Sequence, residues 1–362
     1  MDSLKAQEQN LLEALSESLT QAPVATVSPA LARHDFSLLS SAWQKAIRRS
    51  DASLASRCGL ELHRRDPDYF WRRIRIVVLE DISVGNLEVS ASVLAIAGKR
   101  VLQRRLGDRQ LASHLSAELA GARKSRTACD LACLLPLDTF ATKFLDVGSS
   151  LRVFDKPKLL ALATAWRQTA AYSTQVAGRW RTISRGNPRL RDEYLDLIQA
   201  PPLVRFIAVR GAGTEALNAL LVPAHQLIGA GRTCPTPKPP APASWDLISG
   251  LPAFAFCMYS APGMQAIGEF LRHTPWGGRL QALGVRNLKK ALGHLIFYTE
   301  GGHLSRPLEV LHAPAIREWS EEVSLGRFGI PPDQIAQLKS DMANDLPQLN
   351  AFRRQVNVRT VS

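Results

Sequence analysis

The chain between Asp35 and Arg105 repeats the hydrophobic pattern of an amphipathic helix several times in succession. In the first repeat, apolar residues recur at spacings of three and four, which places them on one helical face: Phe36, Leu39, Trp43 and Ile47. A later repeat begins at Asp66-Pro67, where the carboxylate suits a helix cap and proline suits the first turn. Because short connections make successive helices pack antiparallel, the pattern predicts an all-α fold, a multi-helix bundle of antiparallel amphipathic helices.

Changes of composition along the chain predict its domain organisation. Residues 1–33 are expected to form an N-terminal helix and a linker, and residues 34–232 a helical domain with a basic edge. The Pro-rich stretch at 233–243 cannot continue a helix, so it either separates two domains or forms an exposed loop of one helical body; we favour the loop. Residues 244–362 are expected to form a C-terminal helical region.

The charge of the chain indicates an anionic partner. Lys and Arg number 45 against 32 Asp and Glu, a formal net charge of +13. Such an excess attracts nucleic acid, acidic proteins or anionic surfaces. Arginine is preferred to lysine, which favours phosphate contact because its planar fork fits phosphate oxygens. A coding bias toward G and C would produce the same preference.

The cations of the first domain fall near the predicted helix ends. They are Lys45, Arg48, Arg49, Arg64, Arg65, Arg72, Arg73, Lys99, Arg100, Arg104 and Arg105. In an antiparallel bundle, the ends of alternate helices meet along one edge, so these residues are the predicted nucleic-acid-binding residues. A second interpretation stays open, because cations near helix C-termini also stabilise the helix dipole without any ligand.

Two segments resemble a known family. The run over residues 40–90 resembles the helical C-terminal collar of the bacterial MgsA/RarA group, AAA+ proteins related to clamp loaders. The matching positions are Lys45-Ala46-Ile47-Arg48, Asp66-Pro67, Arg72-Arg73 and Glu80–Asn86. A fainter echo lies at residues 252–263, where Cys257 and Tyr259 replace an acidic residue and a histidine of the related segment. The resemblance implies an oligomerisation or DNA-facing collar, and the absence of a GxxxxGK[ST] motif implies that the ATPase module is missing.

Candidate catalytic and metal-binding groups are scattered. The eight histidines occur singly and the five cysteines include no Cys-x-x-Cys pair. Adjacent Glu80 and Asp81 would point about 100° apart on a helix, which suits a stabilising role near Arg72 or Arg73 better than joint acid–base catalysis. The segment Glu300–His303 holds too few ligands for zinc and favours a turn. We therefore expect no catalytic residue, no cofactor and no metal.

These observations favour a non-enzymatic DNA-binding accessory protein of replication or recombination, encoded by a mobile element such as a plasmid. Its expected partners are duplex or single-stranded DNA or a nucleoprotein complex, with a homo-oligomer as a further expectation and no membrane partner. Two alternatives stay open: an adaptor whose basic surface binds an acidic protein, and an enzyme with a dispersed site, for instance around Glu300–His303. The N-terminus lacks the basic region and apolar core of a signal peptide, which predicts a cytoplasmic location.

Overall fold

Helices form almost all of the regular structure in the computed structural model. It describes residues 2–23, 26, 28–134, 195–196, 199–211, 221, 224–225, 246–308 and 313–361. Within these residues, the only sheet is a two-stranded one, β1 (Leu247–Ile248) paired antiparallel with β2 (Leu251–Pro252). The predicted all-α fold is confirmed. The Pro-rich stretch at 233–243 and much of the predicted domain at 34–232 lie outside the described residues.

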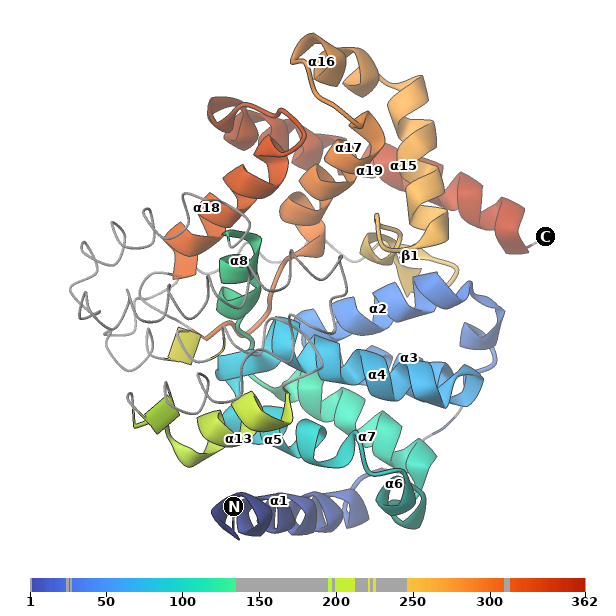
Figure 1. The fold of residues 1–362 in the computed structure, drawn as a ribbon. Coiled ribbons are helices and arrows are strands. Elements are labelled where there is room, and N and C mark those ends of the chain that lie inside the picture. The colour runs from blue at the N-terminus through green and yellow to red at the C-terminus, as the bar shows by residue number, and fades with distance from the viewer. Residues whose placement is uncertain are drawn as a thin grey trace, which may run out of the picture.

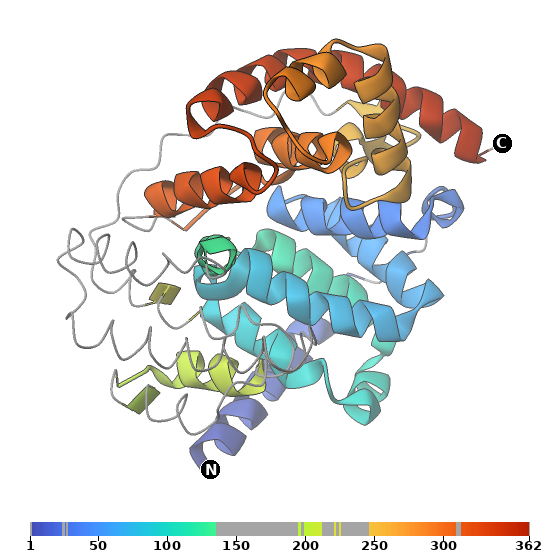
Figure 2. The same ribbon diagram turned by 45° about the horizontal axis from the view of Figure 1, so that its top comes forward.

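The first part of the chain folds into a stack of short helices (Figures 1 and 2). Their bounds are α1 (Asp2–Thr20), η1 (Leu31–Arg33), α2 (Phe36–Arg48), α3 (Ala52–Arg65), α4 (Pro67–Val77), the π-helical turn η2 (Val78–Ile82), η3 (Ser83–Gly85), α5 (Leu87–Ile96), α6 (Arg100–Leu106), α7 (Asp108–Gly121), α8 (Thr127–Leu134) and α13 (Pro202–Arg210). The predicted capping at Asp66 is confirmed, since its side chain accepts a hydrogen bond from the amide of Tyr69 at 2.8 Å.

The helices α2, α3 and α7 approach closely at Gly59. A Cβ atom at Gly59 would lie 2.0 Å from the Oγ of Ser116 on α7, so only glycine fits this crossing. Ser116 in turn accepts a hydrogen bond from the indole of Trp43 on α2 at 3.0 Å. The Trp43 ring also packs against Phe70 of α4, with ring centroids 5.4 Å apart. These contacts hold the three helices in one register.

The C-terminal part has an apolar core of its own. It is built from α15 (Ala261–His273), α16 (Trp276–Ala282), α17 (Leu288–Ile296), the π-helical turn η5 (Phe297–Gly301), α18 (Ala313–Gly326) and α19 (Pro332–Val361). Buried residues such as Phe270, Leu292 and Met342 make up this core.

The two parts meet at α2. The segment before α15, which includes η4 (Ala253–Ala255), packs its apolar residues into the first core. Ser41 of α2 donates a hydrogen bond to the carbonyl of Ala255 at 2.7 Å. Figure 2 shows α15 and α17 above α2, with α3 and α4 beneath it. The helix α2 therefore lies between the two halves of the protein.

Candidate functional site

Three of the predicted nucleic-acid-binding residues lie inside the protein, which corrects the predicted basic edge. Lys45, Arg48 and Arg49, at the end of α2, are 2%, 4% and 7% exposed. Their helix face is polar in the sequence, but the segment before α15 and the turn η5 cover it. Local periodicity cannot reveal this cover, because it comes from residues more than two hundred positions later. These three side chains do not face phosphates.

Arg48 belongs to a buried ionic network centred on Asp81. The Oδ1 of Asp81 accepts hydrogen bonds from Arg48 Nε at 2.8 Å and from Arg126 Nη1 at 2.6 Å. Its Oδ2 accepts one from Gln44 at 2.7 Å. Burial raises the pKa of Asp81, but the two guanidinium groups and these hydrogen bonds outweigh burial and lower the pKa below its ordinary value. The network holds together α2, η2 and the residue that precedes α8.

Glu80 shares Gln44 with Asp81 but lies near a different cation. Its Oε2 accepts a hydrogen bond from Gln44 at 2.7 Å and lies 3.7 Å from Arg73 Nη2. Arg73 also donates to the side-chain oxygen of Gln44 at 2.6 Å. The two adjacent carboxylates therefore lie near different cations, and the contact of Glu80 with Arg73 agrees with the predicted stabilising role near Arg73.

Lys45 contacts a cysteine. Its Nζ lies 2.7 Å from Cys257 Sγ and donates to Ser41 Oγ at 2.7 Å. This contact joins α2 to the segment before α15. Sequence reasoning did not find this pair, because no motif links positions so far apart.

Arg49 and Glu300 belong to a second buried contact. Arg49 donates to the backbone carbonyl of Glu300 at 2.6 Å, and its guanidinium lies 3.6 Å from the ring centroid of Phe254. The carboxylate of Glu300 accepts a hydrogen bond from Arg353 of α19. In the described part of the chain, no cluster of three or more His, Cys, Asp or Glu side chains is arranged to hold a metal ion. Glu300 is thus a partner for arginine.

Three further predicted residues are half-buried and bind internal groups. Arg65 donates to Glu61 at 2.8 Å and to the carbonyl of Leu31 at 2.9 Å. Lys99 lies 3.0 Å from Glu8 of α1. Together with Arg73, these cations connect neighbouring elements of the fold and offer little charge to a partner.

The remaining predicted residues are exposed and, together with Arg109, form a group here called the arginine corner. It comprises Arg64, Arg72, Arg100, Arg104, Arg105 and Arg109, all exposed. Arg109, in the first turn of α7, was missed by the sequence argument because it does not lie at a helix C-terminus. Its position four residues after Arg105 was the available signal.

Contacts between helix ends bring the arginine corner together. Asp108, at the start of α7, lies 3.1 Å from His63 Nε2 at the end of α3 and accepts a hydrogen bond from the indole of Trp71 on α4 at 3.2 Å. Arg100 of α6 pairs with Asp68 of α4 at 2.7 Å. Figures 1 and 2 show α6 on the same side of the molecule as these helix ends. The corner thus unites side chains from α3, α4, α6 and α7.

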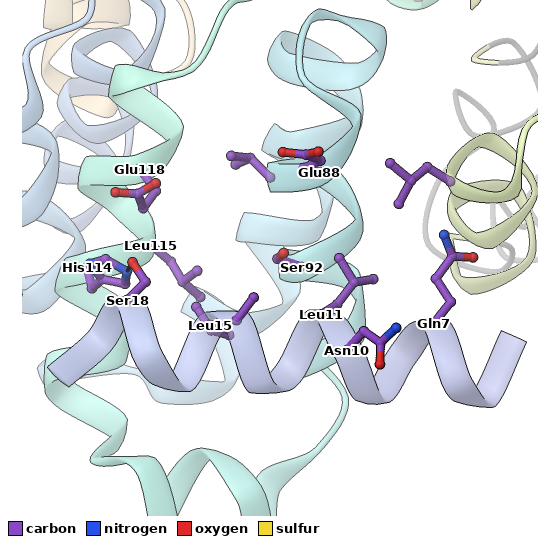
Figure 3. A pocket seen from close by; sticks show the side chains of 13 residues that line it. Gln7, Asn10, Leu11, Leu15, Ser18, Glu88, Ser92, His114, Leu115 and Glu118 are labelled. Carbon is purple, nitrogen blue, oxygen red and sulfur yellow. Dashed lines mark hydrogen bonds between the residues drawn. The ribbon is translucent and has the colours of Figure 1, made fainter. Parts of the chain in front are cut away.

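A groove of about 520 Å³ lies on another part of the surface, between α1, α5 and α7 (Figure 3). Its walls are mostly apolar, and Leu11, Leu15 and Leu115 point into it. Its charged side chains are the carboxylates of Glu88 and Glu118. Because these groups repel phosphate, the groove does not suit an anionic partner and is separate from the arginine corner.

Among the described helices, none combines the length and the apolar character that crossing a membrane requires. Comparison of the chain with protein-family models, with curated proteins and with solved structures finds no match.

Proposed function

We propose that the protein binds nucleic acid through the arginine corner, as a non-enzymatic accessory protein of DNA replication or recombination. The observation that supports this proposal is the charge exposed on neighbouring helix ends. Arg104, Arg105 and Arg109 are exposed, and none of them has an ion pair with another described residue. Charges left unpaired in this way attract a polyanion without first breaking internal contacts.

The chemistry of arginine favours the phosphate backbone as the contact. A guanidinium group donates parallel hydrogen bonds to phosphate oxygens, and each neutralised phosphate releases condensed counterions. Backbone contacts fix the position of a protein on DNA but carry no base sequence. We therefore expect binding in the cytoplasm with little sequence preference. Plasmid or other mobile DNA fits the proposal as well as chromosomal DNA. The resemblance to a clamp-loader collar supports the same class of partner and suggests a homo-oligomer.

Fluorescence anisotropy with labelled duplex and single-stranded DNA at several salt concentrations tests the proposal. Binding should weaken with salt, with a log–log slope of about −0.9 per phosphate contact on duplex DNA. The triple variant Arg104→Gln, Arg105→Gln, Arg109→Gln should weaken binding and flatten this slope. Exposed arginine-to-glutamine changes remove charge with little loss of helix propensity, so the variant should stay folded.

A matched variant controls for net charge. Arg286, Lys289 and Lys290 are exposed near the start of α17, in the C-terminal part of the protein, and their replacement by glutamine removes the same charge. This variant should keep the slope of the wild type. Equal flattening in both variants would reject the corner as the binding surface. An absence of DNA binding by the wild type at low salt would reject the proposed function and favour an acidic protein as the partner.

A further inference from the structure

The contact between Lys45 and Cys257 places a primary amine directly against a thiol. The 2.7 Å between Nζ and Sγ leaves no room for another group between them. Ser41 completes the cluster, since its Oγ accepts a hydrogen bond from Lys45 and lies 3.3 Å from the same sulfur. The Asp81 network described above does not include Cys257. Lys45, Ser41 and Cys257 therefore form a cluster separate from the Asp81 network.

The surroundings of Cys257 stabilise the thiolate. Burial raises the pKa of Cys257, but the charge and hydrogen bond of Lys45, the hydroxyl of Ser41 and the backbone amide of Tyr259 outweigh burial and lower the pKa. The thiolate is the form of cysteine that oxidants attack. Cys257 is only 1% exposed, but Tyr259, whose amide lies 3.3 Å from the sulfur, is 57% exposed. The sulfur is thus buried, two residues before an exposed tyrosine.

We propose that Lys45 and Cys257 form an oxidative cross-linking site, at which hydrogen peroxide converts their contact into a covalent sulfur–nitrogen bond. In the first step, the thiolate attacks one peroxide oxygen, the O–O bond breaks, and the departing hydroxide takes a proton from the Lys45 ammonium. This step gives a sulfenic acid and one molecule of water, with sulfur oxidised by two electrons and peroxide reduced by two. In the second step, the lysine nitrogen attacks the sulfur and the S–O bond breaks, which releases a second water.

The second step follows from the loss of the thiolate charge. Burial already lowers the pKa of Lys45, and the neighbouring Cys257 opposes this effect. As the sulfur becomes a neutral sulfenic acid, Cys257 no longer carries a negative charge to balance the buried ammonium, so the ammonium gives a proton to the departing hydroxide and the neutral amine becomes the nucleophile. The atoms balance: thiolate, ammonium and one peroxide yield the sulfur–nitrogen link and two waters.

The link would join the two halves of the protein. Lys45 lies in α2, and Cys257 lies in the segment that leads into α15 and the second core. A covalent bond between residues so far apart in the chain restricts the unfolded state, as a disulfide does. Oxidation should therefore raise the melting temperature of the full chain, and a thiol reductant should reverse the change.

A buried cysteine elsewhere in the protein provides an internal control. Cys58 is fully buried, and burial raises its pKa to about 12. Within the described residues, no lysine or arginine donates a hydrogen bond to its sulfur, unlike that of Cys257. Cys58 should stay unmodified at a peroxide concentration that cross-links Lys45 to Cys257.

The experiment treats the native full-length protein with hydrogen peroxide and maps its peptides by mass spectrometry. The expected product is a linked pair of peptides containing Lys45 and Cys257, lighter than their sum by two hydrogens and resolved by dithiothreitol. The assignment must come from the linked peptides, because Cys129 and Cys133 could lose the same two hydrogens by forming a disulfide. Trypsin should also fail to cleave after Lys45, since its amine is blocked.

Two variants separate the amine from the charge. Lys45→Arg keeps a cation beside the thiolate, so Cys257 should still oxidise, but it should proceed to the sulfinic acid without a link. Lys45→Met removes both, and Cys257 should react more slowly. The proposal is overturned if the folded wild type gives sulfinic or unmodified Cys257 and no linked peptide. It is equally overturned if Cys58, judged by the same maps, oxidises as fast as Cys257.

Discussion

Arg48 donates a hydrogen bond from Nε to Asp81 at 2.8 Å, and both side chains are buried. Arg126 binds the same carboxylate oxygen, so one acidic side chain balances two guanidinium groups inside the protein. Buried charges of this kind need partners, because removing one partner leaves the others without compensation in a medium of low polarity. Arg48, a predicted phosphate contact, is therefore part of the interior of the protein.

The Asp81→Asn variant should be strongly destabilised. It leaves Arg48 and Arg126 buried without their shared counter-ion, and breaking a buried pair in this way costs about 3–5 kcal/mol. Urea denaturation followed by circular dichroism measures the change in the free energy of unfolding. Asp68→Asn is the control, since Asp68 pairs with Arg100 at the surface and its loss should have little effect. Similar losses in the two variants would contradict the buried network.

The Asp130→Asn variant should change how stability depends on pH. Burial raises the pKa of Asp130 to about 6, more than Arg126 and Arg317 lower it. A carboxyl whose pKa is higher in the folded than in the unfolded protein stabilises the fold when protonated, and this stability is lost as pH rises from about 4 to about 6. The variant, which does not titrate, should therefore gain stability relative to the wild type across this window. Urea unfolding at about pH 4 and about pH 7 measures the gain, and an equal difference at both values would contradict it.

The Gly59→Ala variant should be destabilised by about 1–3 kcal/mol, since the added Cβ would overlap Ser116 Oγ and force α3 away from α7. Gly121→Ala is the matched control. A Cβ at Gly121 has no neighbour within 4 Å, so alanine there should be neutral or stabilising. Thermal unfolding of the two variants measures the contrast. Equal melting temperatures for the two variants would contradict the tight crossing of α3 and α7.

The Leu15→Ala variant should loosen α1 from the body of the protein. Leu15 is buried between α1 and the neighbouring helices, and truncation of a buried leucine costs about 2–5 kcal/mol. Leu11 also borders the groove but is only half-buried, so Leu11→Ala should cost less (Figure 3). Limited proteolysis within the first twenty residues, together with thermal unfolding, would report the difference. Equal losses of stability in the two variants would contradict the deeper burial of Leu15.

Parts of this protein were determined locally, by the sequence alone. The spacing of Phe36, Leu39 and Trp43 predicted a helix because the apolar face of a helix recurs every three to four residues. Asp66-Pro67 predicted a helix start because capping depends only on a carboxylate and the amides that follow it. The all-α fold and the helix bounds near Asp35 and Asp66 follow from such short-range physics.

Only the tertiary structure decided which charges meet solvent. Arg48 and Arg104 both lie at the ends of short helices, yet one is buried against Asp81 and the other is exposed. The difference arises because η4 and η5, distant in sequence, cover the end of α2 but not α6. Burial depends on which segments pack together, and that choice is a property of the whole folded chain, which no local pattern of residues encodes.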